Sequence, residues 1–130
     1  MKFELFDLEK IEDSRGKLIV FEKNNNCPFE VRRAFFMYDN SGSTIRGGHA
    51  NKKSQFLLTA VNGSCKVRVN DGYNEETFLL NAPTKSLFID KMVWKEMFDF
   101  SCDCALLVLS SEKYDSTEYI RTLDEFLASL

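Results

Sequence analysis

An all-β fold, either a sandwich or a barrel of antiparallel strands, is the fold class that this 130-residue sequence predicts. Short segments rich in β-branched and aromatic residues follow one another along most of the chain, and twelve phenylalanines supply side chains that favour strands and bury well. Only short turns separate these segments, whereas parallel strands would need long crossover connections. The strands are therefore expected to be antiparallel and to form a sandwich or a barrel.

About nine strands are expected in order along the chain. The first, at 2–8, carries Phe3 and Leu5 in alternation and would be an edge strand, a ready template for pairing with a second copy of the chain. A turn at 13–16 leads into the second strand. The strands after this turn are expected at 17–23, 31–39, 55–61, 65–71, 77–80, 87–90, 92–100 and 104–111.

Two of these strands flank the sequence Asn-Gly-Ser at 62–64, which is typical of a tight turn. We therefore expect 55–61 and 65–71 to pair directly as a hairpin. From Cys65 onward the second of them has an apolar residue at every other position, which is the period of a strand with one face in water.

Only the C-terminal segment has helical character. Asp115 is followed three residues later by Glu118, an arrangement close to a capping box, and the apolar residues after them recur at helical spacing. We expect one amphipathic helix at about 116–129, packed on the sheets of a single domain that spans residues 1–130.

The net charge of −3 argues against nucleic acid as a partner, because phosphate backbones attract basic surfaces. No apolar run approaches the ~20 residues of a transmembrane helix, and acidic residues interrupt the N-terminal segment where a signal peptide would be apolar. We therefore expect a cytoplasmic protein that does not bind a membrane. The four cysteines lack the spacing of a zinc site and would be reduced thiols.

His49 is the only histidine of the chain, and it follows a pair of glycines that leave the backbone free to turn or to let a ligand approach. Asn51 would share its face of a strand, and Arg46 precedes it across the glycine turn. One face would then present a cation, an imidazole and an amide at the mouth of a pocket. A lone structural histidine in a loop is the competing interpretation.

Arg32 and Arg33 lie inside an otherwise apolar strand, so one of the two points to the inner face. A charge there is costly unless it is paired. Arg33 would therefore either meet a carboxylate such as Glu22 or Glu96, or wait for an anionic ligand.

Lys95 shares a strand face with Val93 and Met97. The only tryptophan, Trp94, lies on the other face and is expected to be a core residue, with stacking on a ligand as the alternative. Arg15 lies in the turn at 13–16, and its position alone predicts a solvated turn residue.

Motifs over almost the whole chain match one known family in the same order. They are DSRGKL (13–18), VRRAFFMYD (31–39), RGGHANKK (46–53), NGSCKVRVNDG (62–72), VWKEMFDFS (93–101), LLVLSSEKYDSTEYIR (106–121) and DEF (124–126). In these motifs the chain resembles the small WxcM-like cupins, whose best-known members are dTDP-4-oxo-6-deoxyglucose 3,4-ketoisomerases.

The resemblance implies an RmlC-like cupin, a jelly-roll β-sandwich, that works without a metal or any other cofactor. It also implies a homodimer, commonly with N-terminal strands shared between subunits. The substrate would be a dTDP-linked 4-oxo-6-deoxyhexose, on the route to 3-amino-3,6-dideoxy sugars of bacterial surface glycans. In this reaction a base removes the C3 proton, an enediol forms, and a proton delivered to C4 leaves the carbonyl on C3.

By the same resemblance, His49 matches the first histidine of the family's H-A-H motif and would be the general base. Asn51 takes the place of the second histidine in the catalytic set, where it can hydrogen-bond a sugar oxygen but cannot relay a proton as a base. Arg33 and Arg46 match arginines that line the nucleotide-sugar pocket.

Arg15 matches a pocket position at which the family varies, and an arginine there resembles the members that form the galacto-configured 3-oxo product. Lys95, a further candidate for binding the substrate, stands where those members tend to have histidine. Phe35 stands where many ketoisomerases have a tyrosine that can shuttle protons.

Four functions remain open at this point. The first is a working 3,4-ketoisomerase. The second is an epimerase on the same substrate class, which would share the first proton abstraction. The third is a cupin that keeps the dTDP-sugar pocket but has lost turnover, which the changes at Asn51 and Phe35 favour. The last is a structural domain of a larger glycan-assembly complex.

Overall fold

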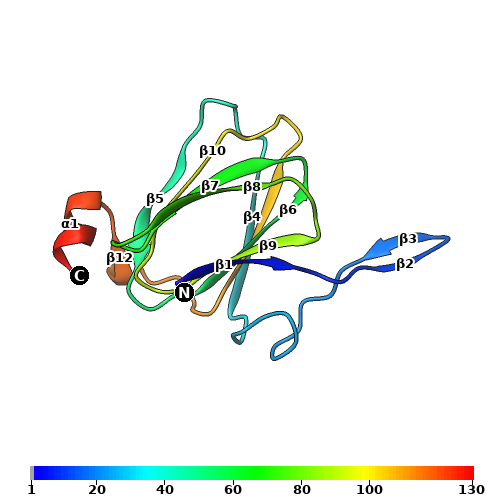
Figure 1. Cartoon of the computed structure of the whole chain (residues 1–130), viewed down its shortest axis with the longest axis horizontal. Coiled ribbons are helices and arrows are strands. Elements are labelled where there is room, and N and C mark those ends of the chain that lie inside the picture. Colours follow the sequence, from blue (N-terminus) through cyan, green and yellow to red (C-terminus); the bar gives the residue numbers. More distant parts are fainter. Residues whose placement is uncertain (1) are drawn as a thin grey trace.

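Two five-stranded antiparallel sheets form the body of the protein (Figure 1) in a computed structural model that describes residues 2–130. The first sheet has the order β1 (Phe3–Asp7), β9 (Lys85–Ile89), β6 (Phe56–Asn62), β11 (Ala105–Ser110) and β4 (Arg33–Tyr38). The second has the order β12 (Tyr119–Ile120), β5 (Arg46–Asn51), β10 (Trp94–Phe98), β7 (Cys65–Asn70) and β8 (Glu75–Leu80). The predicted all-β class, an antiparallel jelly-roll sandwich, is confirmed.

The hydrophobic core fills the space between the two sheets, because strands of both sheets turn an apolar side chain inward at every second residue. In β7 the residues Cys65, Val67 and Val69 are buried and the residues between them are partly exposed, as the alternation predicted. Each fully buried aliphatic or aromatic side chain contributes roughly 1.5–3 kcal/mol. The largest core side chains include Phe3, Leu58, Leu80, Leu87, Ile89, Leu106 and Val108.

The predicted hairpin between the strands at 55–61 and 65–71 is wrong. β6 pairs with β9 and β11 in the first sheet, whereas β7 pairs with β8 and β10 in the second, so the turn at Gly63 carries the chain from one sheet to the other. β6 is buried on both faces, since Leu57 packs against an outer cluster with Cys27 and Phe29. A strand that is buried on both faces lies in the centre of its sheet. The residues of the turn carry no information about this burial.

The strand expected at 17–23 forms only at its start. β3 (Gly16–Leu18) pairs with β2 (Ile11–Asp13), and this hairpin projects from the sheets at the end of the molecule away from the C-terminal helix (Figure 1). The following residues run without regular pairing and bury Cys27 and Phe29 on the outer face of the first sheet.

The C-terminal helix is shorter than expected, because α1 spans only Leu123–Ala128. Its N-cap is Thr122, whose side chain accepts a hydrogen bond from the Glu125 amide. Asp115 caps a single 3-10 turn instead, and the chain then pairs with β5 as β12. Strand pairing and the burial of Ile120 in a cluster with Trp94 outweigh the helical spacing of the apolar residues.

Phe126 is the one buried residue of α1, and it contacts the cluster of Trp94, Ala50 and Ile120. The helix therefore covers a core cluster, and Trp94 is a core residue, both as expected. No helix within residues 2–130 is long and apolar enough to cross a membrane.

Candidate active site

A cavity of about 550 Å³ lies between the two sheets. Four of the candidate residues line it: Arg33, Arg46, His49 and Lys95. The other lining residues are aromatic, apolar or glycine: Ala34, Phe35, Phe36, Met37, Tyr38, Gly47, Phe56, Leu58, Met97, Val108, Tyr114 and Tyr119. Within the described residues 2–130, the lining thus combines three cationic side chains and one imidazole with no carboxylate.

A bulge in β5 directs both Arg46 and His49 into this cavity. On β10, Lys95 lies opposite His49 and Met97 lies opposite Arg46, with Gly48 as the extra residue between these pairs. In a regular strand, two residues three positions apart face opposite ways, and the bulge removes that mismatch. The glycines therefore lie within the strand, and the expected turn before it does not form.

Both glycines of the bulge are required by the backbone. Gly47 and Gly48 have φ angles of 79° and 73°, in the region that side chains rarely adopt. A Cβ atom added to Gly47 would also lie 2.8 Å from the carbonyl oxygen of Lys95, which is closer than atoms in contact allow.

His49 is held in its neutral form. Burial lowers its pKa to about 4, and the cationic charges of Lys95, Arg121 and Arg33 act in the same direction. The imidazole packs on the ring of Tyr119 with a centroid separation of 4.8 Å and an interplanar angle of 58°. A neutral imidazole in a cavity can accept a proton from a bound molecule.

Lys95 is a buried amine without a carboxylate partner among residues 2–130. It is 3% exposed, and its Nζ donates a hydrogen bond of 2.9 Å to Asn51 Oδ1 and lies 4.7 Å from the centroid of the Phe56 ring. Burial lowers the pKa of Lys95 to about 7, against the opposing charge of Glu118. Both protonation states are therefore accessible near neutral pH.

Asn51 lies behind Lys95 and does not line the cavity. It is 1% exposed, its Oδ1 accepts the hydrogen bond from Lys95 Nζ, and its side-chain amide helps to lower the pKa of Glu118. The register also places Asn51 opposite Tyr119 of β12. His49 and Asn51 were predicted to share one face of the strand. In the structure their surroundings differ, because His49 lines the cavity and Asn51 is buried behind Lys95.

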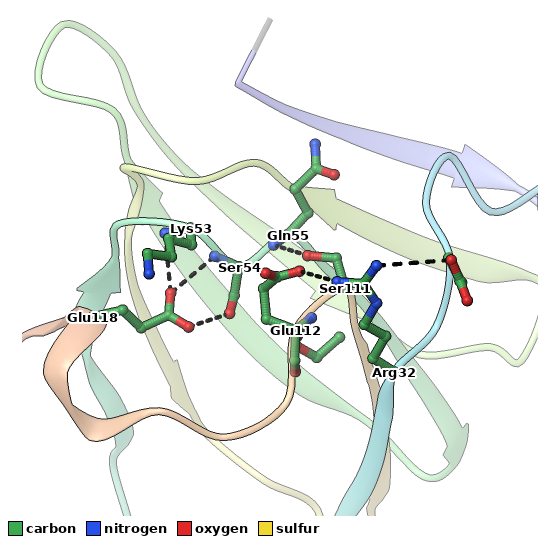
Figure 2. Close-up of polar contacts among 9 residues, drawn as sticks. Arg32, Lys53, Ser54, Gln55, Ser111, Glu112 and Glu118 are labelled. Carbon is green, nitrogen blue, oxygen red and sulfur yellow. Dashed lines mark hydrogen bonds and ion pairs between the residues drawn. The ribbon is translucent and has the colours of Figure 1, made fainter.

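The segment after β5 is fixed by the buried carboxylate of Glu118 (Figure 2). This carboxylate accepts hydrogen bonds from the backbone amides of Lys53 and Ser54, at 3.0 and 2.9 Å, and from the Ser54 hydroxyl at 2.6 Å. Burial raises the pKa of Glu118, but these hydrogen bonds outweigh it and hold the pKa below its usual value. Since Tyr119 follows directly, the same contacts position the ring that packs on His49.

Arg33 and Arg46 carry charge into the cavity without an acidic partner among the described residues 2–130. The Arg33 guanidinium lies over the rings of Phe35 and Tyr114, at 5.1 and 5.5 Å from their centroids, and its buried Nε has no hydrogen-bond partner within residues 2–130. Arg46 Nε donates to the neutral amide oxygen of Asn40 at 2.6 Å.

The carboxylate partners considered for Arg33 do not pair with it. Glu96 instead pairs with Arg68 at 2.8 Å, and Glu22 forms none of the ion pairs within residues 2–130. The alternative left for Arg33 is an anionic ligand.

Arg15 lies far from the other candidate residues, outside the cavity of its own chain. It lies at the turn of the β2–β3 hairpin, its side chain is 88% exposed, and it pairs with Asp13. The hairpin projects outward (Figure 1). Arg15 therefore has no contact with the cavity formed by its own chain.

Tyr114 and Tyr119 line the cavity, but no motif singled them out. The helical spacing of the C-terminal segment predicted that Tyr119 lies in a helix. That prediction gave no reason to expect its contact with His49. Within residues 2–130, no three His, Cys, Asp or Glu side chains are grouped to hold a metal ion. The metal-free chemistry implied by the resemblance remains a prediction.

Known proteins share this architecture along nearly the whole chain. The TDP-4-oxo-6-deoxy-alpha-D-glucose-3,4-oxoisomerase of Aneurinibacillus thermoaerophilus is 42% identical over 126 residues, which cover 97% of this chain and 91% of the relative. The X-ray structure of WlaRA, a TDP-fucose-3,4-ketoisomerase of Campylobacter jejuni, superposes with a TM-score of 0.95 and 43% identity over 99% of this chain and 96% of that one.

A second Campylobacter jejuni protein, the WlaRB TDP-quinovose 3,4-ketoisomerase, has a TM-score of 0.93 and 42% identity over 97% of each chain. The family described as "FdtA: WxcM-like, C-terminal" matches residues 1–130. The chain belongs to this family, as its sequence motifs predicted.

Proposed function

We propose that this protein is a 3,4-ketoisomerase that moves the carbonyl of dTDP-4-oxo-6-deoxyglucose from C4 to C3. The observation that carries the proposal is a cavity in which a neutral imidazole, His49, lies beside the guanidinium groups of Arg33 and Arg46, neither of which forms an ion pair within residues 2–130. Relatives at 42–43% identity bear the names of TDP-sugar 3,4-ketoisomerases.

The two arginines suit the diphosphate of a nucleotide sugar. Guanidinium groups grip phosphate oxygens with paired N–H donors, and Arg33 has a buried Nε still free for this purpose. The exposed aromatic residues Phe36, Tyr38 and Tyr114 provide flat surfaces near the opening on which a base can stack. A net charge of −3 on the whole chain does not oppose this, because the charge in the cavity is local and positive.

His49 is the proposed base that removes the C3 proton. The charges of Lys95 and Arg33 contribute to its low pKa. A bound diphosphate offsets part of that positive charge, which raises the pKa of His49 toward the range in which an imidazole is an effective base. The ammonium group of Lys95 also favours negative charge on the enediolate oxygens.

Arg15 and the product configuration belong to the same proposal. Relatives named for TDP-fucose and for TDP-quinovose are equally similar to this chain, so the galacto configuration rests on Arg15 alone. Because its hairpin projects from the sheets and Arg15 is not among the residues that line the cavity of its own chain, Arg15 acts in the cavity of a second subunit of a homodimer. The cytoplasmic location, the place in surface-glycan synthesis and the independence from cofactors stay predictions.

A cupin that binds dTDP-sugars without turnover is the second candidate. It is favoured by the burial of Asn51 behind Lys95 and by Phe35, which offers no hydroxyl to the cavity. Incubation with dTDP-4-oxo-6-deoxyglucose in deuterated water separates the two functions. We expect the 3-oxo product, with deuterium on C4, in NMR spectra.

An epimerase would return a 4-oxo sugar with one inverted centre, and a binding protein would retain dTDP with no deuterium in the sugar. Either result contradicts the isomerase. His49→Asn is the matched variant, because it should lose turnover while the Kd for dTDP stays close to that of the wild type.

A further inference from the structure

Two cationic or basic side chains face each other across neighbouring strands at the floor of the cavity. Lys95 of β10 lies directly opposite His49 of β5, and both line the cavity. Directly opposed residues of antiparallel strands have Cβ atoms roughly 4.5–5.5 Å apart. A sugar carbon within reach of the imidazole therefore has its neighbouring oxygens within reach of the amine.

We infer that Lys95 is the group that carries a proton between the C4 and C3 oxygens of the substrate, and that Asn51 positions its amine for this transfer. The inference deepens the proposed isomerase function and rests on it. Asn51 Oδ1 accepts the hydrogen bond of 2.9 Å from Lys95 Nζ, and both residues are almost completely buried. Asn51 acts through the lysine, since it does not line the cavity itself.

The transfer is balanced within the two side chains and the sugar. In the first half, His49 removes the C3 proton while the Lys95 ammonium gives a proton to the C4 oxygen, which yields an enediol, an imidazolium and a neutral amine. In the second half, the imidazolium returns a proton to C4 and the amine accepts the proton of the C3 hydroxyl as the C3 carbonyl forms. Both side chains end as they began, with no oxidant, reductant or co-reactant.

Other groups at the cavity suit this task less well. Arginine does not release its proton near neutral pH, which excludes Arg33 and Arg46. Tyr38 and Tyr114 are largely exposed at the opening. The Tyr119 hydroxyl faces the Arg33 guanidinium, at 3.5 Å from Nη2.

Lys95 can exist in both forms that the transfer requires. Its pKa is lowered to about 7, chiefly by burial, and Glu118 of the 3-10 turn opposes this shift. The other charged or titratable groups that line the cavity are His49 and Arg46 on β5, Arg33 and Tyr38 on β4, Tyr119 on β12, and Tyr114.

Lys95→Arg is the deciding variant, because it keeps the positive charge and removes the ability to exchange a proton at neutral pH. We expect kcat to fall by about 10²-fold or more, while the Kd for dTDP stays near that of the wild type. Lys66→Arg, at a partly exposed lysine of β7 that is not among the cavity-lining residues, is the matched control and should keep the turnover of the wild type. Wild-type turnover in Lys95→Arg would overturn the inference.

Lys95→Ala provides a second measurement that does not depend on accommodating the larger arginine. Methylamine should restore part of its turnover in proportion to amine concentration, whereas guanidinium ion should not, because only the amine can exchange a proton. Equal effects of the two ions, or no rescue in a folded variant that binds dTDP, would contradict a shuttle. A covalent adduct between Lys95 and the sugar after cyanoborohydride treatment would show that Lys95 forms an imine with the substrate and would overturn the proton shuttle.

Asn51 is tested by the pH profile of kcat/KM. Lys95 must start as the ammonium form, so activity should fall on the alkaline side as it deprotonates. Asn51→Leu removes the acceptor of the ammonium group and should move this limb to lower pH with a lower kcat. Asn51→Asp adds a negative charge beside the ammonium and should move the limb to higher pH. If the alkaline limbs of both variants lay at the same pH as that of the wild type, Asn51 would not act through Lys95.

The wild type separates failure of this inference from failure of the proposed function. Product formed by the wild type together with full turnover in Lys95→Arg overturns the shuttle and leaves the isomerase intact. Absence of product in the wild type overturns both.

Discussion

Lys95 lies directly opposite His49 on neighbouring antiparallel strands, and its charge helps to hold the pKa of His49 at about 4. Burial is the larger cause, so neutralising the lysine should raise this pKa without restoring it to the usual 6.5. Since His49 is the only histidine, its imidazole proton signals in NMR spectra are unambiguous. We expect a titration midpoint near pH 4 in the wild type and a higher midpoint in Lys95→Met. An unchanged midpoint would show that the two groups do not interact.

Lys95→Met should stabilise the protein while impairing catalysis. The folded protein keeps the pKa of Lys95 near 7, far below the usual 10.5, so between these values the unfolded chain binds more protons and wild-type stability rises with pH. Below pH 7 the buried charge imposes its full cost. Replacing it with an apolar side chain should add about 1–4 kcal/mol to the free energy of unfolding.

Urea denaturation at about pH 6 and about pH 9 measures this effect, and the gain should be larger at the lower pH. Lys66→Met, at a partly exposed position on β7, is the matched control and should change stability little. A gain that does not depend on pH would point to packing rather than to the buried charge.

Arg33 should contribute to nucleotide binding where its neighbour Arg32 does not. Arg33→Met removes an unpaired guanidinium from the cavity, and the Kd for dTDP should rise by roughly 10- to 100-fold. Arg32 points to the other side of the chain and pairs with Glu112 at 3.4 Å (Figure 2), so Arg32→Met should leave the Kd nearly unchanged. Titration calorimetry compares the two, and equal losses would indicate only a general effect of charge.

Mixed dimers test whether Arg15 serves the cavity of a second subunit. Arg15→Ala and His49→Asn should each lower formation of the galacto-configured product. Unfolded together and refolded, they should form heterodimers in which one cavity combines His49 of one chain with Arg15 of the other. Activity should then recover in part. If Arg15 acted in its own cavity, neither cavity of the heterodimer would be complete and no recovery would follow.

The strand pattern was the part of the fold that local sequence could predict. In β7 the alternation from Cys65 to Val69 reports directly which face is buried, because the side-chain period of a strand is two. The hairpin failed because Gly63 permits a tight reversal within one sheet or a connection between two sheets equally well. What decides is the burial of both faces of β6, including Leu57, which depends on a loop more than 25 residues away in sequence.

Within the site, sequence motifs identified His49, Arg33 and Arg46, and the cavity brings these together. They could not predict the contact between Lys95 and Asn51, because it depends on the register of β5 against β10. They also missed Tyr119, whose local spacing is helical while its actual partner is a strand distant in sequence. Both features depend on pairing between segments distant in sequence, which a local pattern does not contain.

The extra residue in β5 makes the site unusually sensitive to changes in chain length. Gly48 is the extra residue of the bulge, and it puts Arg46 and His49 on the same face of β5, so that both side chains line the cavity. Deletion of this one residue would leave every functional side chain encoded in the gene. It would nevertheless turn either the arginine or the histidine to the outer surface, because a shift of one residue exchanges the two faces of a strand. Outside the two glycines, natural variants of this segment should therefore tolerate substitution better than insertion or deletion.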